Sequence, residues 1–296
     1  MKGVLVIDKP RGPTSHDVVA RVRRALKTRE VGHAGTLDPM ATGVLVVAVG
    51  EATKLVPYLT AHDKAYVAEL TFGAATDTLD AEGAVTAESP VPADVAAEIA
   101  RGSGPRLDAA LAHERARTRQ APPAYSAIKT DGRPAYERAR RGEVVELADR
   151  DVVVRSIEVV GSGPLSLHLQ VVVGKGYYVR SLARDLAETL GTLGHLTALR
   201  RVRSGPFGEG EAAKLDAPDL AERLLGVERA ATRALPHVVL APTAEADARA
   251  GRAVALPEGA PAAGVPHAWL SEGGALIAVG RREESGVGRV VRGFRP

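Results

Sequence analysis

Hydrophobic and polar residues follow two different spacings along the chain, one typical of strands and the other of helices. Residues 3–10 (GVLVIDKP) and 44–50 (VLVVAVG) are short apolar runs, which predict strands with little exposed surface. Residues 64–73 (KAYVAELTFG) alternate instead, so every second side chain from Tyr66 to Phe72 is expected on one face of a strand. These three ranges predict the first strands of a sheet.

Helical spacing first appears in residues 14–28 (TSHDVVARVRRALKT). Val18 and Val22 mark one apolar stripe, and the basic residues lie elsewhere around the helix. Thr14 or Ser15 can cap the first turn, because a hydroxyl there accepts a hydrogen bond from a free backbone N–H group. The range therefore predicts an amphipathic helix directly after the first strand.

Both kinds of element continue in the second half of the chain. Residues 94–118 have helical patterns, residues 151–160 and 165–173 predict two strands, and residues 177–191 (YYVRSLARDLAETLG) predict a helix. Strands and helices do not alternate regularly. The pattern therefore predicts an α+β fold, in which a mixed, mainly antiparallel sheet is flanked by helices.

The pattern of apolar and turn-forming residues changes at about His237. From there, short apolar segments are separated by turn-forming stretches such as PEGAPAAG and SEGG, which predict a small β-rich module. We therefore expect two domains, residues 1–236 and residues 237–296.

The composition is that of an ordinary globular protein, with 296 residues, 45% hydrophobic and 25% charged. The longest apolar run, near Val44 to Val49, is too short to span a bilayer, and Met1 leads into a strand-like run without the apolar core of a signal peptide. We therefore expect a cytoplasmic protein without a membrane partner. The absence of cysteine excludes disulfides, thiolate zinc sites and cysteine nucleophiles.

Signatures of common cofactors are missing from the sequence. It contains no G-x-x-x-x-G-K-[ST] phosphate loop and no G-x-G-x-x-G after a strand, and its eight histidines never pair at metal-ligand spacing. The sequence therefore favours chemistry that uses neither a metal nor a cofactor.

Basic residues gather between Arg115 and Arg141, where eight of them stand against two acidic residues, although the net charge of the chain is only +3. Such a strip can follow a phosphate backbone. A solvated face of an arginine-rich protein is the alternative interpretation. Aromatic residues make up only 3% of the chain, so any stacking on bases would use a few chosen tyrosines or arginines.

One carboxylate stands in a glycine-punctuated loop, residues 32–43 (GHAGTLDPMATG). Pro39 biases Asp38 toward an extended backbone, and the glycines permit tight turns on either side, so the loop can present Asp38 at the mouth of the next strand. An Asx-type turn is the simpler interpretation of this residue on its own. By the same standard, His33 is a loop histidine and Lys9 a surface turn residue.

Arg180 falls in the first turn of the predicted 177–191 helix, where the macrodipole disfavours a cation. A solvent-facing arginine that tolerates this small cost is the simpler interpretation. Alternatively, Arg180 faces a cleft and pairs with Asp38, because a planar guanidinium can hold a carboxylate ionised and oriented. Tyr66 and Tyr178 also have two interpretations, a functional one and a structural one, since most tyrosines on strands or helix faces simply pack against their neighbours.

Together these segments resemble one family. GHAGTLDPMATGVL closely resembles the catalytic motif of the TruB-type tRNA pseudouridine-55 synthases, and seven further segments, among them TDTLDAEG and YYVRSLARDLAETLG, match that family's other blocks in order. The similarity runs from about residue 3 to residue 232. It implies an isomerase that detaches uracil from its ribose and rejoins it through carbon, at position 55 in the T-arm loop of tRNA, without a cofactor.

The resemblance also implies a role for each matching residue. Asp38 is the catalytic aspartate that attacks the target nucleoside, Arg180 pairs with it, and Tyr66 lies against the flipped base, where it can take part in proton transfer. Tyr178 and Leu199 line the uracil pocket, Lys9 supports the site, and His33 fills the gap left in the RNA loop.

The basic strip resembles the family's thumb, at about residues 115–142, which grips the T-arm. The expected contacts to the RNA backbone are Lys129, Arg133, Arg138, Arg140 and Arg141. Residues 237–296 correspond to the place where family members often carry a PUA-like RNA-binding module.

Three segments depart from the family pattern. Ala34 replaces the usual threonine, Tyr177 replaces the threonine that commonly precedes the pocket tyrosine, and LAHERARTRQAPP lacks the familiar glycine-containing approach to the two prolines. The first two lie beside the expected site, so they bear on its packing rather than on the reaction.

Three other functions are considered beside this one. An RNA-binding protein without chemistry would need the basic strip but not Asp38, Tyr66 and Arg180 together. A guide-RNA-dependent synthase subunit shares the motif, but a compact chain without long basic tails favours a stand-alone monomer with no obligate protein partner. A nucleoside hydrolase would also use a carboxylate to break the glycosidic bond, but it would admit water to the site and release free base.

Overall fold

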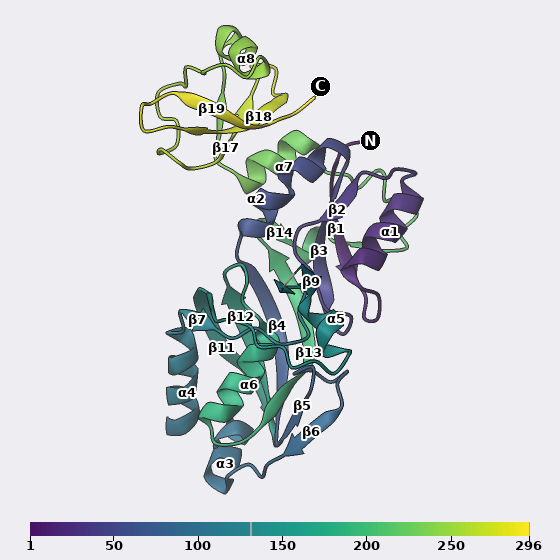
Figure 1. Cartoon of the computed structure of the whole chain (residues 1–296), viewed down its shortest axis with the longest axis vertical. Helices are drawn as coiled ribbons and strands as arrows, with labels where there is room; N and C mark the ends of the chain where they lie inside the picture. Colours follow the sequence, from purple (N-terminus) through teal and green to yellow (C-terminus); the bar gives the residue numbers. More distant parts are fainter. Residues whose placement is uncertain (131, 296) are drawn as a thin grey trace. The chain divides into compact units, whose positions relative to one another are not determined.

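The computed structural model describes residues 1–130 and 132–295, which form two compact units (Figure 1). Among these residues, no helix has both the length and the apolar character that crossing a bilayer would require. The first unit comprises residues 1–37, 44–61 and 205 onward, and the second comprises residues 38–43 and 62–204.

The second unit is built on an antiparallel sheet. Its strands lie in the order β11 (Val154–Gly163), β12 (Ser166–Val173), β4 (Lys64–Phe72) and β13 (Gly194–Ser204), and each neighbouring pair is antiparallel. The first two residues of β3 (Thr42–Val49) pair in parallel with β13. The sheet is therefore mixed and mainly antiparallel, as the sequence predicts.

Strand β4 shows the predicted alternation. Tyr66, Ala68, Leu70 and Phe72 are all buried, whereas Val67 between them is exposed. Because β4 lies between β12 and β13, both of its edges are hydrogen-bonded and one of its faces is covered.

Three helices pack on this sheet: α3 (Ala93–Arg101), α4 (Pro105–Arg115) and α6 (Val179–Thr189) (Figure 1). The helical pattern predicted over residues 94–118 is therefore split in two, because the left-handed backbone of Gly102 ends α3. Helix α6 agrees with its predicted range and buries the whole predicted apolar stripe, which consists of Val179, Leu182, Leu186 and Leu190.

Short elements complete the second unit and connect its main strands and helices. They are β5 (Ala74–Thr76), β6 (Val85–Glu88), β7 (Arg119–Gln120), β8 (Lys129–Thr130), β9 (Arg133–Pro134), α5 (Ala135–Ala139) and β10 (Arg150–Asp151).

The first unit contains β1 (Gly3–Lys9), with β3 and β15 (Ala213–Lys214) as its neighbours, and β2 (Val31–His33) lies antiparallel to β3. Helix α1 (Ser15–Ala25) follows β1. Thr14 caps it with a full capping box: its hydroxyl accepts a hydrogen bond from Asp17 N–H, and the Asp17 carboxylate accepts one from Thr14 N–H. Of the two predicted capping residues, Thr14 is the one used.

A small β-sheet lies at the end of the chain, as the sequence predicts. Its strand order is β16 (His237–Val239), β17 (His267–Leu270), β18 (Leu276–Arg282) and β19 (Gly288–Gly293). Helix α8 (Pro242–Arg249) packs against it and was not expected. The domain boundary between residues 236 and 237 remains a prediction.

The two faces of this small sheet belong to different cores within the first unit. On one face, the fully buried Trp269 packs with α8 and Ile277. On the other, Leu270 and Val279 join a core that also contains Val4 and Val44 from β1 and β3. The terminal sheet is thus packed into the same core as the first strands of the chain.

The remaining elements of the first unit lie between these parts of the chain. They are a 3-10 helix over Gly50–Leu55, α2 (Val56–Ala61), β14 (Phe207–Gly208), a second 3-10 helix over Glu209–Glu211, and α7 (Val227–Ala234).

Gly43, at the end of the loop that carries Asp38, lies against the backbone of Arg201. Its φ is +98°, and a Cβ atom at this position would overlap the carbonyl group of Arg201, its neighbour across the β3–β13 pairing. Both constraints require glycine here, so the loop enters β3 by a path that other residues cannot follow.

We expect Gly43→Ala to lower the free energy of unfolding by about 1–3 kcal/mol more than Gly12→Ala. Gly12 is a matched control, because its φ is +106° but a Cβ atom added there would have no neighbour within 4 Å, so that variant carries only the cost of the positive φ. Denaturant unfolding of both variants measures the difference. Equal destabilisation would show that the close approach to Arg201 is not restrictive.

Candidate active site

Asp38 and Arg180 form a two-point ion pair. Arg180 Nε lies 2.9 Å from Asp38 Oδ2, and Arg180 Nη2 donates a hydrogen bond to Asp38 Oδ1 at 3.1 Å. The arginine side chain is 5% exposed and the aspartate side chain 33% exposed. The structure therefore presents one accessible carboxylate whose direction is set by a buried guanidinium.

Arg180 makes further contacts beyond this ion pair. Its Nη1 donates to the carbonyl oxygen of Thr78, and its Nη2 donates to that of Tyr125, both at 2.9 Å. Its Nε lies 3.7 Å from a second carboxylate, Asp80 Oδ2. The simpler interpretation of Arg180 as a solvent-facing residue is therefore wrong, because loops that contain Asp38, Thr78 and Tyr125 enclose its side chain.

Asp80 is a candidate site residue that the sequence did not single out. It is 5% exposed, and its Oδ1 accepts hydrogen bonds from Thr78 Oγ1 at 2.6 Å and from Glu82 N–H at 3.1 Å. Leu79, just before it, has a φ of +60°, which is uncommon for a leucine. This loop therefore places a second, buried carboxylate beside Arg180.

Three further predicted residues lie in the second unit. Tyr178 is the N-cap of α6, two residues before Arg180, and burial raises the pKa of its phenol, so the hydroxyl stays protonated at neutral pH. Tyr66 is on β4 and Leu199 on β13, and both are at most 9% exposed. Across these strands Leu199 is opposite Ala68, two residues from Tyr66.

Family models match most of the chain. The model described as TruB family pseudouridylate synthase (N terminal domain) matches residues 23–179, and the tRNA pseudouridylate synthase B C-terminal domain matches residues 180–245. The chain belongs to the TruB family of pseudouridylate synthases. Asp38 and Arg180 lie in the two different matched regions, and the fold brings them together.

Known relatives agree with this family. The tRNA pseudouridine synthase B of Paracoccus denitrificans (strain Pd 1222) is 44% identical over 285 residues, which cover 94% of this chain and 92% of the relative. The protein of the same name from Thermobifida fusca (strain YX) is 50% identical over 222 residues, covering 72% and 73%. TruB-family sequence is thus found along nearly the whole chain.

Solved structures with the same fold include synthases in complexes. A Cbf5-Nop10-Gar1 complex contains a chain with a TM-score of 0.74 and 28% identity, covering 99% of this chain and 84% of that one. An H/ACA RNP bound to a substrate RNA containing 2'-deoxyuridine gives a TM-score of 0.72 and 26% identity, with 99% and 85% covered. The α+β fold predicted from the sequence is therefore confirmed.

Lys9 and His33 lie in the first unit. Lys9, at the end of β1, is fully buried, and its Nζ donates to the carbonyl oxygen of Pro10 at 2.9 Å. The interpretation of Lys9 as a surface residue is therefore wrong. His33 ends β2, and its ring meets that of His16 edge to face at a centroid distance of 5.4 Å.

The basic strip divides into a structural part and an exposed part. Arg117 is committed to the carboxylates of Glu114 and Asp185, so it does not add to a phosphate-binding surface. Arg133, Arg140 and Arg141 are exposed. Arg138 pairs with Glu143 at 2.7 Å, and Asp131 and the side chain of Lys129 lie outside the described residues.

No metal site is found among residues 1–130 and 132–295, where no three histidine or acidic side chains gather in a way that could hold an ion. Around Arg180, the described residues of the second unit bring together two carboxylates, the accessible Asp38 and the buried Asp80.

We expect Asp80→Asn to slow conversion of uridine to pseudouridine about 10- to 100-fold, because it removes a buried negative charge that lies 3.7 Å from Arg180 Nε. Glu82→Gln is the matched control, since it removes a negative charge from the same loop but changes an exposed side chain. Single-turnover rates of both variants measure the effect. A rate for Asp80→Asn equal to that of the control would assign Asp80 a purely structural role.

Proposed function

We propose that this protein isomerises uridine to pseudouridine at position 55 in the T-arm loop of tRNA, and that Asp38 is the group that attacks the target nucleoside. The observation that carries the proposal is the two-point ion pair between Asp38 and the buried Arg180. The names of its relatives support tRNA as the substrate. We further propose that the chain acts as a cytoplasmic monomer.

The reaction needs a charged group that acts while the base is detached from the sugar. The bond between N1 and C1′ breaks, a bond between C5 and C1′ forms, the C5 proton leaves and N1 gains a proton, so there is no net oxidation. A carboxylate is a usual protein group for glycosyl transfer. Asp38 attacks either the ribose C1′ or the uracil ring, and on both routes Arg180 orients it and stabilises its charge.

A flipped uridine also needs a dry pocket, because water could otherwise add to the ribose C1′ in place of the uracil ring and leave a hydrolysed product. We assign the walls of this pocket to Tyr178, Leu199 and Tyr66, which are buried or half-buried aromatic and aliphatic side chains in the unit that holds Asp38. Tyr66 lies against the base and takes part in proton transfer. Lys9 supports the site, and His33 fills the space that the base leaves in the RNA loop.

Extruding a base costs a few kcal/mol, which contacts to the RNA backbone must offset. We assign these contacts to the exposed part of the basic strip, Arg133, Arg140 and Arg141, together with Arg138 and Lys129. The terminal sheet of residues 237–296 is assigned a PUA-like role in RNA binding. Catalysis and RNA binding therefore depend on different side chains and can be tested separately.

We expect Asp38→Ala to abolish tritium release from a tRNA transcript labelled at uridine C5. The purified wild-type chain should release tritium without any added protein or guide RNA. The variant should bind the tRNA with unchanged affinity, because the group it lacks acts on the base rather than on the backbone. Asp38→Asn, which keeps the shape of the side chain, is the control for altered packing and should also be inactive.

Three outcomes would contradict this assignment. Equal turnover by wild type and Asp38→Ala would remove Asp38 from the reaction. Free uracil as the product would indicate a nucleoside hydrolase. A wild-type chain that binds tRNA but needs added protein or guide RNA for turnover would indicate a subunit of a larger enzyme.

We expect replacement of Arg138, Arg140 and Arg141 by glutamine to weaken tRNA binding and to flatten its salt dependence, by about 0.7–0.9 in log–log slope for each phosphate group that is no longer neutralised. The three residues are clustered, and two of them are exposed. Arg101→Gln on α3 is the control for loss of an exposed positive charge. Unchanged binding across the salt titration would remove this cluster from the RNA-binding surface.

A further inference from the structure

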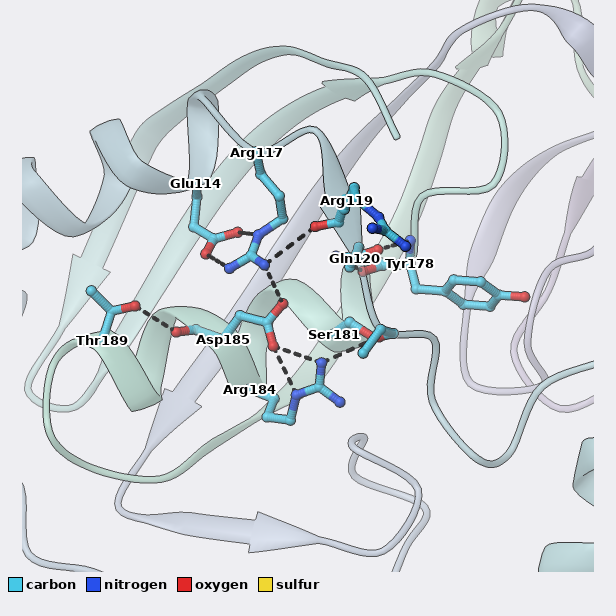
Figure 2. Close-up of polar contacts among 10 residues, drawn as sticks. Glu114, Arg117, Arg119, Gln120, Tyr178, Ser181, Arg184, Asp185 and Thr189 are labelled. Atoms are coloured by element: carbon cyan, nitrogen blue, oxygen red, sulfur yellow. Dashed lines mark hydrogen bonds and ion pairs between the residues drawn. The ribbon is translucent and has the colours of Figure 1, made fainter. Parts of the chain in front are cut away.

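Gln120 joins the end of β7 to the start of α6 through two hydrogen bonds (Figure 2). Its Nε2 donates to the Tyr178 carbonyl oxygen at 3.2 Å, and its Oε1 accepts from the Tyr178 N–H group at 2.9 Å. The side chain thus satisfies both backbone polar groups of one residue, as a neighbouring strand would. Gln120 is 1% exposed, so water does not compete for these bonds.

The paired residue stands at the point where α6 begins. Tyr178 is the N-cap, with φ of −110° and ψ of 113°, and an N–H group at this position has no partner within the helix. Gln120 supplies that partner. Because the amide holds both polar groups of the Tyr178 backbone, it restrains the direction in which the side chain leaves the helix start, and in Figure 2 the ring points away from the neighbouring charged side chains.

Adjacent contacts hold the same turn of the helix. The carbonyl oxygen of Ala121, the next residue after Gln120, accepts hydrogen bonds from Ser181 Oγ at 2.8 Å and from Arg184 Nη2 at 3.2 Å (Figure 2). Two consecutive residues therefore receive or make four hydrogen bonds with the start of α6. Of these four bonds, only the two made by Gln120 reach the residue proposed to line the uracil pocket.

An ion network fixes the approach of the chain to Gln120. Arg117 Nε donates to Glu114 at 2.8 Å, and Arg117 Nη1 lies 3.5 Å from Asp185 on α6 (Figure 2). Buried Tyr177 stands beside these groups, and burial together with the nearby Glu114 carboxylate raises its pKa, so it stays neutral. Arg117 and Tyr177 both belong to segments that depart from the family pattern.

We infer that Gln120 is a positioning residue for the reaction, which holds Tyr178 and, two residues later, Arg180 in the arrangement that orients Asp38. The inference rests on the proposed function. It follows from the direct contact with Tyr178 and from the short path to Arg180, whose Nη2 in turn binds the carbonyl oxygen of Tyr125. A small rotation at the N-cap would shift the guanidinium away from both carboxylates.

The alternative is that Gln120 only stabilises the fold. Ser181→Ala provides the matched control, because Ser181 is fully buried in the same turn of α6 and its hydroxyl binds the residue next to Gln120, but it does not contact Tyr178. Removal of either side chain weakens the attachment of α6. Of the two changes, only the one at Gln120 removes hydrogen bonds of the Tyr178 backbone, whose N–H group then loses its acceptor while its carbonyl oxygen keeps the bond from Leu182 N–H.

The test compares Gln120→Met, Gln120→Glu and Ser181→Ala in single-turnover conversion of a tRNA transcript, with tRNA affinity and unfolding measured in parallel. We expect Gln120→Met to lower the rate at least about tenfold with the dissociation constant for tRNA within about twofold, whereas Ser181→Ala keeps the rate within about twofold. Gln120→Glu keeps the acceptor for Tyr178 N–H, and its rate relative to wild type should rise as its carboxyl group becomes protonated at lower pH and can again donate.

A rate for Gln120→Met within about threefold of wild type, after correction for the folded fraction, would overturn the inference, as would an equal reduction in Ser181→Ala. If Gln120→Met does not fold, a rate for Gln120→Glu that matches wild type independently of pH would overturn it instead. Wild type and Asp38→Ala in the same assay report separately on the proposed function, because its failure would leave wild type without turnover.

Discussion

The arrangement of the site depends on one buried cation shared by two carboxylates. Arg180 is almost entirely removed from water, and a guanidinium in that position is tolerated only when its charge and its donors are satisfied. Asp38 and Asp80 supply the charge, and the carbonyl oxygens of Thr78 and Tyr125 each accept a hydrogen bond from the guanidinium. Because Asp80 is buried and Asp38 is accessible, the same arginine is anchored on one side and directs a reactive group on the other.

This division explains the placement of the surrounding elements. The sheet of the second unit provides rigid strands for Tyr66 and Leu199, whereas the charged residues come from loops and from the first turn of α6. A helix start is an unfavourable place for a cation, and the cost of about 0.3–1 kcal/mol is small beside the two ion pairs. The position of Arg180 is therefore set by its partners and not by helix preference.

Local patterns predicted those features that depend on local sequence. Alternation placed the buried face of β4, and the capping hydroxyl of Thr14 or Ser15 identified the start of α1. Asp80 could not be found in this way, because an aspartate in a turn-rich acidic stretch is usually solvated, and only the distant Arg180 distinguishes it. Similarly, Arg117 increased the apparent charge of the basic strip, although Glu114 and Asp185 neutralise it. Helix α8 was missed because its alanine-rich sequence has no clear apolar stripe.

The core of the first unit has a consequence for the order in which the protein is made. Val4 and Val6 share one hydrophobic core with Phe207, Val227 and Leu276, which are synthesised much later. The packing of β1 is therefore completed only after these later segments have been synthesised. During translation, the strands of residues 62–204 have their sheet partners available earlier, so the part that holds Asp80 and Arg180 can take shape before the core around Val4 and Val6 is complete.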